Sequence, residues 1–137
     1  MQIKDALERA RTIAVVGCSP RGFQTSHRIA RYLQEVGYAV VPVNPHHDEI
    51  LGAPCYPDLP AIPADVALDI VTVFRRSEHT PGVVEDAIAR MEATGDRPMI
   101  WTQYGVHHPE AQRLAEAAEL PYVESRCIMV DHQLLLG

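Results

Sequence analysis

The chain has 137 residues, of which 47% are hydrophobic and 22% are charged, and it carries a formal net charge of −6 at pH 7. This composition predicts one globular domain over residues 1–137, and the acidic balance argues against general binding to nucleic acid. No stretch approaches a membrane span, and the charged first ten residues do not resemble a signal peptide. The three cysteines form no CxxC pair, so we expect a cytoplasmic protein with reduced thiols and no membrane partner.

The first third of the chain predicts a helix followed by a strand and a second helix. Apolar residues recur at helical spacing in residues 2–10, and the continuous apolar run over residues 13–16 is typical of a buried parallel strand. An amphipathic helix is predicted over residues 26–36. Gly37 follows it in the position where a glycine commonly ends a helix.

The middle of the chain repeats this alternation after an irregular segment. Residues 39–43 form a second apolar run, and residues 44–63 hold five of the eleven prolines, which predicts an ordered crossover with one short helical turn. A third strand is expected over residues 68–74. Thr80 is placed to cap a helix whose first residue is a proline, and Gly95 is placed to end that helix.

The last third predicts a fourth strand over residues 99–102, a helix opened by Pro109 and a short fifth strand over residues 122–124. The apolar tail over residues 128–135 fits a strand or a helix. Strands that alternate with helices predict parallel pairing through right-handed crossovers. We therefore expect an α/β fold, a single doubly wound Rossmann-like domain whose five-stranded, mainly parallel sheet has helices on both faces.

Ligands of such sheets bind beyond the carboxyl ends of the strands, so the loop after the first strand is informative. A dinucleotide fold has the pattern G-x-G-x-x-G, whereas this chain has Gly17, Ser19 and Gly22 at those positions. Backbone N–H groups, the cation of Arg21 and the hydroxyl of Ser26 lie next to a predicted helix N-terminus, which suits a phosphate. The alternative is a tight turn in which Ser26 only caps the helix.

The second strand is followed by Asn44, Pro45, His46 and His47, where an NAD-dependent protein would place an acidic residue for the ribose hydroxyls. This difference makes NAD less favoured. The adjacent histidines lack an identifiable third metal ligand, so a surface loop explains them better than a metal site. No metal is therefore predicted.

The third strand is followed by Arg75 and Arg76, which either meet phosphates or form a solvated pair balanced by Glu78. Cys127 follows the fifth strand beside a cation, Arg126, that would favour its thiolate. A nucleophilic cysteine needs a base, and the nearest in the sequence is His132. The spacing does not establish this pair, so no catalytic residue is assigned.

Taken together, these strand ends resemble the CoA-binding domain proteins of the small bacterial YccU-type family. They resemble more distantly the CoA-binding domain of the succinyl-CoA synthetase alpha subunit. The resemblance covers nearly the whole chain and rests on an ordered set of segments. These are Val16-Gly17-Cys18-Ser19-Pro20, Val41-Pro42-Val43-Asn44-Pro45, Asp69-Ile70-Val71-Thr72-Val73-Phe74-Arg75-Arg76, Trp101-Thr102-Gln103-Tyr104-Gly105-Val106 and Arg126-Cys127-Ile128-Met129-Val130-Asp131-His132.

The resemblance implies that coenzyme A is the ligand and lies across the strand ends. The family commonly has a lysine or arginine after the Asn-Pro turn, where this chain has histidines, so Arg75 or Arg76 would have to meet the 3′-phosphate. The implied contacts are Gly17, Ser19, Arg21 and Ser26 for the phosphates, Asn44, Pro45, Val73, Phe74 and Arg75 for the adenosine, and Gln103, Gly105 and Cys127 for the pantetheine.

The resulting hypothesis is a protein that binds CoA or an acyl-CoA as a non-catalytic or regulatory module. One alternative is a redox role in which Cys127 forms a mixed disulfide with the CoA thiol. A second alternative is an NAD(P)-binding protein, which the missing ribose acid disfavours. The leucines at positions 134–136 either complete a homodimer or pack on the protein's own sheet.

Overall fold

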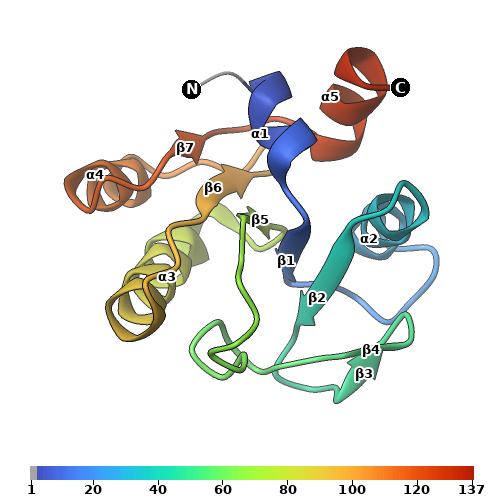
Figure 1. Cartoon of the computed structure of the whole chain (residues 1–137), viewed down its shortest axis with the longest axis horizontal. Helices are drawn as coiled ribbons and strands as arrows, with labels where there is room; N and C mark the ends of the chain where they lie inside the picture. Colours follow the sequence, from blue (N-terminus) through green and yellow to red (C-terminus); the bar gives the residue numbers. More distant parts are fainter. Residues whose placement is uncertain (1–2) are drawn as a thin grey trace.

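The computed structural model describes residues 3–137 and shows one parallel sheet between two layers of helices (Figure 1). The sheet consists of β1 (Thr12–Val16), β2 (Ala39–Val43), β5 (Ile70–Val73), β6 (Met99–Thr102) and β7 (Tyr122–Val123). The helices are α1 (Ile3–Arg9), α2 (Thr25–Glu35), α3 (Thr80–Thr94), α4 (Pro109–Ala117) and α5 (Ile128–Leu135). The predicted α/β fold is thus confirmed. Residue 2 of the first predicted helix lies outside the described residues.

All neighbouring strands of this sheet are parallel, in the order β2-β1-β5-β6-β7. The chain leaves β1 for β2 on one side and later returns to place β5 on the other side of β1. The direction of winding therefore reverses between β1 and β5. In doubly wound sheets the ligand crevice opens at this switch point, beyond the carboxyl ends of the strands.

The strands are apolar on both faces because each face is covered by helices. Ile13, Val15 and Trp101 face the layer of α1, α2 and α5, and they are fully buried. Ala14 and Ile100 alternate with them and face α3 and α4. The continuous apolar runs in the sequence are the expected signature of strands buried in this way.

One segment differs from the sequence expectations, and the structure of another decides between two alternatives. The crossover after β2 contains a short antiparallel hairpin, β3 (Glu49–Ile50) and β4 (Ala53–Pro54), which the proline-rich composition did not predict. The turn of this hairpin uses a positive φ at Leu51 and at Gly52. The apolar tail is a helix, α5, whose start packs into the core through Ile128.

The helix ends explain most of the predicted boundaries. Gly37 and Gly95 have positive φ angles of 108° and 86° just after their helices, as glycine ends require. His108 caps α4, because its Nδ1 accepts a hydrogen bond from the backbone N–H of Glu110 at 3.1 Å. Thr80 does not cap α3 as predicted: a 3₁₀ turn over Ser77–His79 precedes it, so Thr80 is already helical and fully buried.

The irregular crossover is held by one buried cation, Arg90 of α3, whose side chain is 2% exposed. Its Nε donates to Asp96 Oδ2 at 3.0 Å, and its terminal nitrogens donate to backbone carbonyls of the crossover, Pro63 at 3.0 Å among them. The carbonyls of Leu59, Ile62 and Val66 complete the set. The crossover has no neighbouring strand to pair with, so the guanidinium provides the hydrogen-bond donors that its buried carbonyls need.

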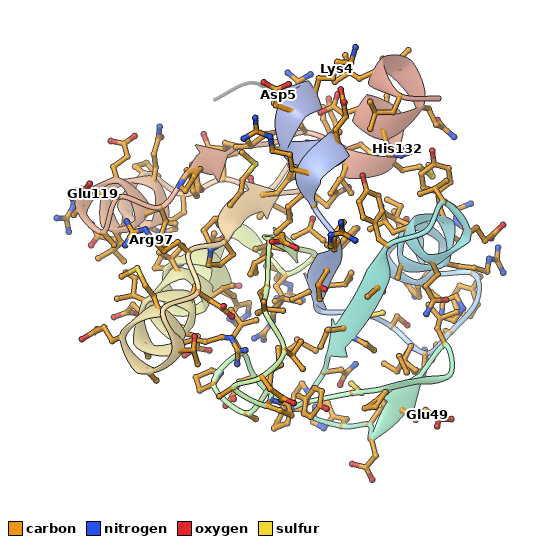
Figure 2. All side chains as sticks on the ribbon, viewed as in Figure 1. Lys4, Asp5, Glu49, Arg97, Glu119 and His132 are labelled. Atoms are coloured by element: carbon orange, nitrogen blue, oxygen red, sulfur yellow. The ribbon has the colours of Figure 1, made fainter. Side chains whose placement is uncertain are left out.

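The amino edge of the sheet is closed by an aromatic cluster that joins α1, α2 and α5. His132 of α5 lies where these helices meet (Figure 2), and its Nδ1 is 2.6 Å from Tyr32 Oη of α2. Tyr38 packs edge-on against the same imidazole and donates a hydrogen bond to the carbonyl of Leu7 in α1. Burial lowers the pKa of His132. None of the helices within residues 3–137 is long and apolar enough to cross a membrane.

Candidate functional site

Two cavities open at the carboxyl edge of the sheet, on either side of the loop between β1 and α2. The first, called here the wide cleft, has a volume of about 770 Å³. The second, the narrow pocket, has a volume of about 210 Å³. The wide cleft is lined by Thr25, Ile29, Phe74, Gln103, Tyr104, Val106, Ser125, Arg126, Cys127, Val130 and Asp131. The narrow pocket is lined by Val16, Gly17, Val43, Asn44, Pro45, His46, Pro57 and Arg75.

The loop between the two cavities is held in shape by its own serines. The backbone N–H of Ser19 donates to Ser26 Oγ at 2.9 Å, and the N–H of Arg21 donates to Ser19 Oγ at 3.1 Å. Ser26 is therefore not the helix cap, because α2 begins at Thr25 and the Ser26 hydroxyl is used inside the loop. The N–H groups of the first turn of α2 have no acceptor within the helix and form the positive end of its dipole.

Gly17 is required by the close approach of two strand ends. Its φ is +86°, and a Cβ at this position would lie 3.0 Å from Arg75 Cγ and 3.1 Å from the carbonyl oxygen of Phe74. The missing Cβ therefore lets the chain turn away from β1 directly beside the end of β5.

The narrow pocket is organised by Asn44, which bridges the ends of β1 and β2. Its Nδ2 donates to the carbonyl of Cys18 at 3.0 Å, and its Oδ1 accepts from the N–H of His46 at 2.9 Å. The two arginines predicted near this site separate. Arg75 lines the pocket, whereas the side chain of Arg76 is 85% exposed and lies 3.8 Å from Glu78.

The polar side chains of the wide cleft are largely hydrogen-bonded to other groups of the protein. Gln103 is 6% exposed, and its Oε1 accepts from the N–H of Ile128 at 3.0 Å, which fixes the start of α5. Ser125 Oγ accepts from the N–H of Gly105 at 2.9 Å. The guanidinium of Arg126 binds both oxygens of Asp131, at 2.7 and 2.9 Å, and this carboxylate raises the pKa of Arg126.

The thiols of Cys127 and Cys18 differ in their surroundings. Cys127 precedes α5, is partly buried and lines the wide cleft. Its neighbour Arg126 is directed at Asp131, and His132 is hydrogen-bonded to Tyr32 at the other edge of the sheet, so the structure does not form a Cys127–His132 pair. Cys18 is fully buried, and burial raises its pKa to about 12, which makes it a packing residue.

The structure gathers most of the predicted site residues at this edge. Gly17, Asn44, Pro45 and Arg75 line the narrow pocket, Phe74, Gln103 and Cys127 line the wide cleft, Ser19, Arg21 and Ser26 form the loop between them, and Gly105 is bound to the cleft residue Ser125. Two do not join them: Arg76 turns to solvent, and Val73 is fully buried with its carbonyl bound to the N–H of Gln103.

Several cleft residues were missed by sequence reasoning. Ile29 of α2 and the loop residues Tyr104 and Val106 line the cleft, although the strand-end argument assigns none of them to the site. Val130 was hidden because the tail was undecided between strand and helix. A helical reading of that tail would have placed Cys127 at the helix start and Val130 within one turn of it.

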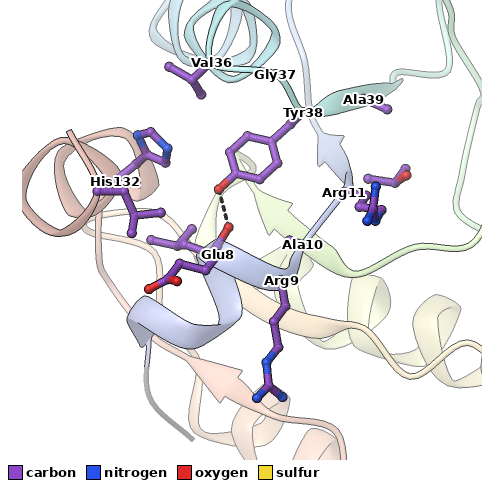
Figure 3. A pocket seen from close by; sticks show the side chains of 12 residues that line it. Glu8, Arg9, Ala10, Arg11, Val36, Gly37, Tyr38, Ala39 and His132 are labelled. Atoms are coloured by element: carbon purple, nitrogen blue, oxygen red, sulfur yellow. Dashed lines mark hydrogen bonds between the residues drawn. The ribbon is translucent and has the colours of Figure 1, made fainter.

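A further cavity, of about 810 Å³, lies at the opposite, amino edge. Its wall includes Arg9, Arg11, Tyr38 and His132 (Figure 3). It is far from the loop and from the strand ends that the site residues follow. Within residues 3–137, no group of three His, Cys, Asp or Glu side chains is arranged to hold a metal ion.

Comparison with known proteins gives a family match and two relatives that cover nearly the whole chain. The family described as "CoA binding domain" matches residues 11–133. The uncharacterized protein YneT of Bacillus subtilis is 40% identical over 131 residues, which cover 96% of this chain and 92% of that protein. A hypothetical protein from Pyrococcus horikoshii, known from its solved structure, is 36% identical with a TM-score of 0.89, over 100% of this chain and 94% of that chain.

A much longer protein shares part of the chain. The ADP-forming acetate–CoA ligase I of Archaeoglobus fulgidus is 40% identical over 76 residues, which cover 56% of this chain but 11% of the ligase. The match lies within a small portion of that protein.

Proposed function

The chain belongs to the CoA-binding domain family, and on that premise we propose that it binds coenzyme A or an acyl-CoA at the carboxyl edge of its sheet. The module has no reaction of its own and serves as a binding or regulatory unit. The observation that carries this proposal is the pair of cavities that flank the β1–α2 loop at the switch point of the sheet. CoA is long, with a nucleotide at one end and a thiol at the other, and this arrangement offers a compartment for each end.

The loop suits the pyrophosphate between the two compartments. The first-turn N–H groups of α2 point outward from the helix N-terminus, where an anion is favoured by the helix dipole. Arg21 is exposed on the same loop and adds a cation. The pyrophosphate would therefore be met by backbone donors and one guanidinium, with Ser19 and Ser26 keeping the loop in shape.

The narrow pocket suits the adenosine, and Arg75 suits its 3′-phosphate. Arg75 lines this pocket together with Asn44 and Pro45, and its stem packs against Gly17. A guanidinium is the side chain best fitted to a phosphate, because it can donate two parallel hydrogen bonds. Arg76 is paired with Glu78 at the surface and is the natural control.

Titration calorimetry with CoA, dephospho-CoA and NAD⁺ tests the proposal. We expect CoA to bind and NAD⁺ not to bind, and we expect Arg75→Met to weaken CoA by roughly tenfold to a hundredfold, the usual size of a charged hydrogen bond. Dephospho-CoA lacks the 3′-phosphate, so the same variant should leave its affinity nearly unchanged. Arg76→Met should have little effect on either ligand. Binding of NAD⁺ in preference to CoA would overturn the proposal.

A further inference from the structure

The wall of the wide cleft is largely apolar, although the thiol end of CoA that it would receive is polar. Its apolar side chains come from the helices α2 and α5 and from the loops after β5 and β6, so they surround the cleft on several sides. Tyr104 and Val130 keep 82% and 43% of their surface exposed there. The apolar wall consists of Ile29, Phe74, Tyr104, Val106 and Val130.

The polar side chains of the cleft offer little to an incoming polar group. Ser125 Oγ already accepts the N–H of Gly105, and Arg126 is bound through two nitrogens to Asp131. These groups are satisfied within the protein, so the remaining free surface of the cleft is largely hydrocarbon. Such a surface favours an apolar ligand group over water.

Among the buried polar side chains of the cleft, Gln103 and Asp131, the amide of Gln103 is the one that keeps a free donor. The residue is 6% exposed, and the hydrogen bond from Ile128 N–H to Oε1 fixes which way the amide faces. Within residues 3–137 its Nε2 has no acceptor. Within residues 3–137 the side-chain polar atoms that are both fully buried and without a hydrogen-bond partner are the hydroxyls of Thr72 and Thr80. Gln103 Nε2 is not one of them, so it keeps some contact with solvent, and the residue lines the cleft. A nearly buried N–H₂ group without an acceptor is costly, and a ligand oxygen would satisfy it.

We infer that the wide cleft holds the acyl group of a CoA thioester, and that Gln103 Nε2 donates a hydrogen bond to the thioester carbonyl oxygen. This inference rests on the proposed function, which brings the sulfur end of CoA to Gln103 and Cys127. The acyl chain then lies against the apolar wall formed by Phe74 and Val130. The ligand class is thereby narrowed from CoA to acyl-CoA with an apolar acyl group of several carbons.

The affinity of the native protein for a series of thioesters tests the chain site. We expect affinity to rise from acetyl-CoA through butyryl-CoA to hexanoyl-CoA by up to about fourfold for each buried methylene. Val130→Asp should flatten this series. Leu134→Asp, one turn further along the same helix at a position that is 78% exposed and outside the cleft, should leave the series intact.

The carbonyl contact is tested with S-hexyl-CoA, a thioether in which a methylene replaces the carbonyl of hexanoyl-CoA. Gln103→Glu keeps the oxygen that accepts from Ile128 but removes the N–H₂ donor. We expect this variant to lose about tenfold or more of the affinity for hexanoyl-CoA relative to S-hexyl-CoA. An equal loss for both ligands would mean that Gln103 does not hold the thioester carbonyl.

The two proposals fail in different ways. If CoA binds and affinity does not increase with acyl length, the acyl site is refuted and the proposed function stands. If neither CoA nor any thioester binds, the proposed function itself is refuted, and this inference with it. Because the chain-length series uses the native protein, it does not depend on the folding of any variant.

Discussion

Replacement of Gly17 by alanine separates two costs that a glycine can carry. The first is conformational: a φ of +86° is unfavourable for an L-residue by about 1–2 kcal/mol. The second is steric, because the new Cβ would lie 3.1 Å from a backbone oxygen of Phe74, which cannot move without shifting β5. Crowding of this kind adds about 1–3 kcal/mol. The sum is about 2–5 kcal/mol, a large part of the stability of a single domain.

Two other glycines serve as controls, one with the conformational cost alone and one with neither cost. Gly37 also has a positive φ, 108°, but a Cβ there would meet nothing within 4 Å, so Gly37→Ala should show the conformational cost alone. A Cβ at Gly22 would likewise meet nothing within 4 Å, and its φ is not in the left-handed range, so Gly22→Ala should change stability by about 0.5 kcal/mol or less.

Urea unfolding of the three variants, followed by circular dichroism, measures these differences directly. The thermal midpoint of Gly17→Ala should fall by roughly 4–20 °C, given about 2–4 °C for each kcal/mol in a domain near this size. CoA binding should weaken as well, because the Cβ displaces the stem of Arg75. Equal destabilisation by Gly17→Ala and Gly37→Ala would refute the argument that the strand ends touch at Gly17.

Three further predictions concern other parts of the molecule. Arg90→Met should destabilise the protein by about 3–5 kcal/mol in urea unfolding, because it strands the buried carbonyls of the crossover, whereas the exposed Arg113→Met should change stability by less than about 1 kcal/mol. The free energy of unfolding should decrease as the pH falls below the ordinary pKa of histidine, about 6.5, because burial lowers the pKa of His132 and the unfolded chain then binds more protons than the folded protein. The free energy of unfolding of His132→Gln should depend less on pH over this range. In labelling of the native protein by a thiol reagent, Cys127 should react first and Cys18 only on unfolding.

Each of these has an outcome that would contradict it. Similar losses for the two arginine variants would show that the guanidinium of Arg90 does not organise the crossover. A pH dependence that His132→Gln leaves unchanged would assign the titration to another group. Early labelling of Cys18 would mean that the loop after β1 opens in the native state.

Local patterns predicted the regular elements because burial on both faces leaves a clear trace in the sequence. The apolar runs gave the strands of the main sheet, and Gly37 and Gly95 marked helix ends through the φ angles that glycine permits. The hairpin β3–β4 was not predictable, because two-residue strands have too few positions to show a period. Thr80 was misplaced since the 3₁₀ turn before it shifts the helix start.

The site was predictable as a set of strand ends but not in its details. Neighbouring residues in the sequence can face opposite ways, and Arg75 and Arg76 do so: one lines a pocket and the other binds Glu78 at the surface. Val73 is adjacent to the site in sequence but faces the core on the side of α3 and α4. The role of Gln103 depends on its bond to Ile128, a contact across 25 residues that no local pattern contains.

The positions of the terminal helices bear on how such a unit can be joined to other chains. α1 packs against α5 (Figure 1), and Leu7 of α1 and His132 of α5 line the cavity at the amino edge. The β1–α2 loop and the two cavities beside it lie at the carboxyl edge, at the opposite end of the strands. A linker joined next to α1 or α5 would therefore leave that loop and both cavities uncovered, so the fold is suited to attachment to a longer polypeptide through these helices.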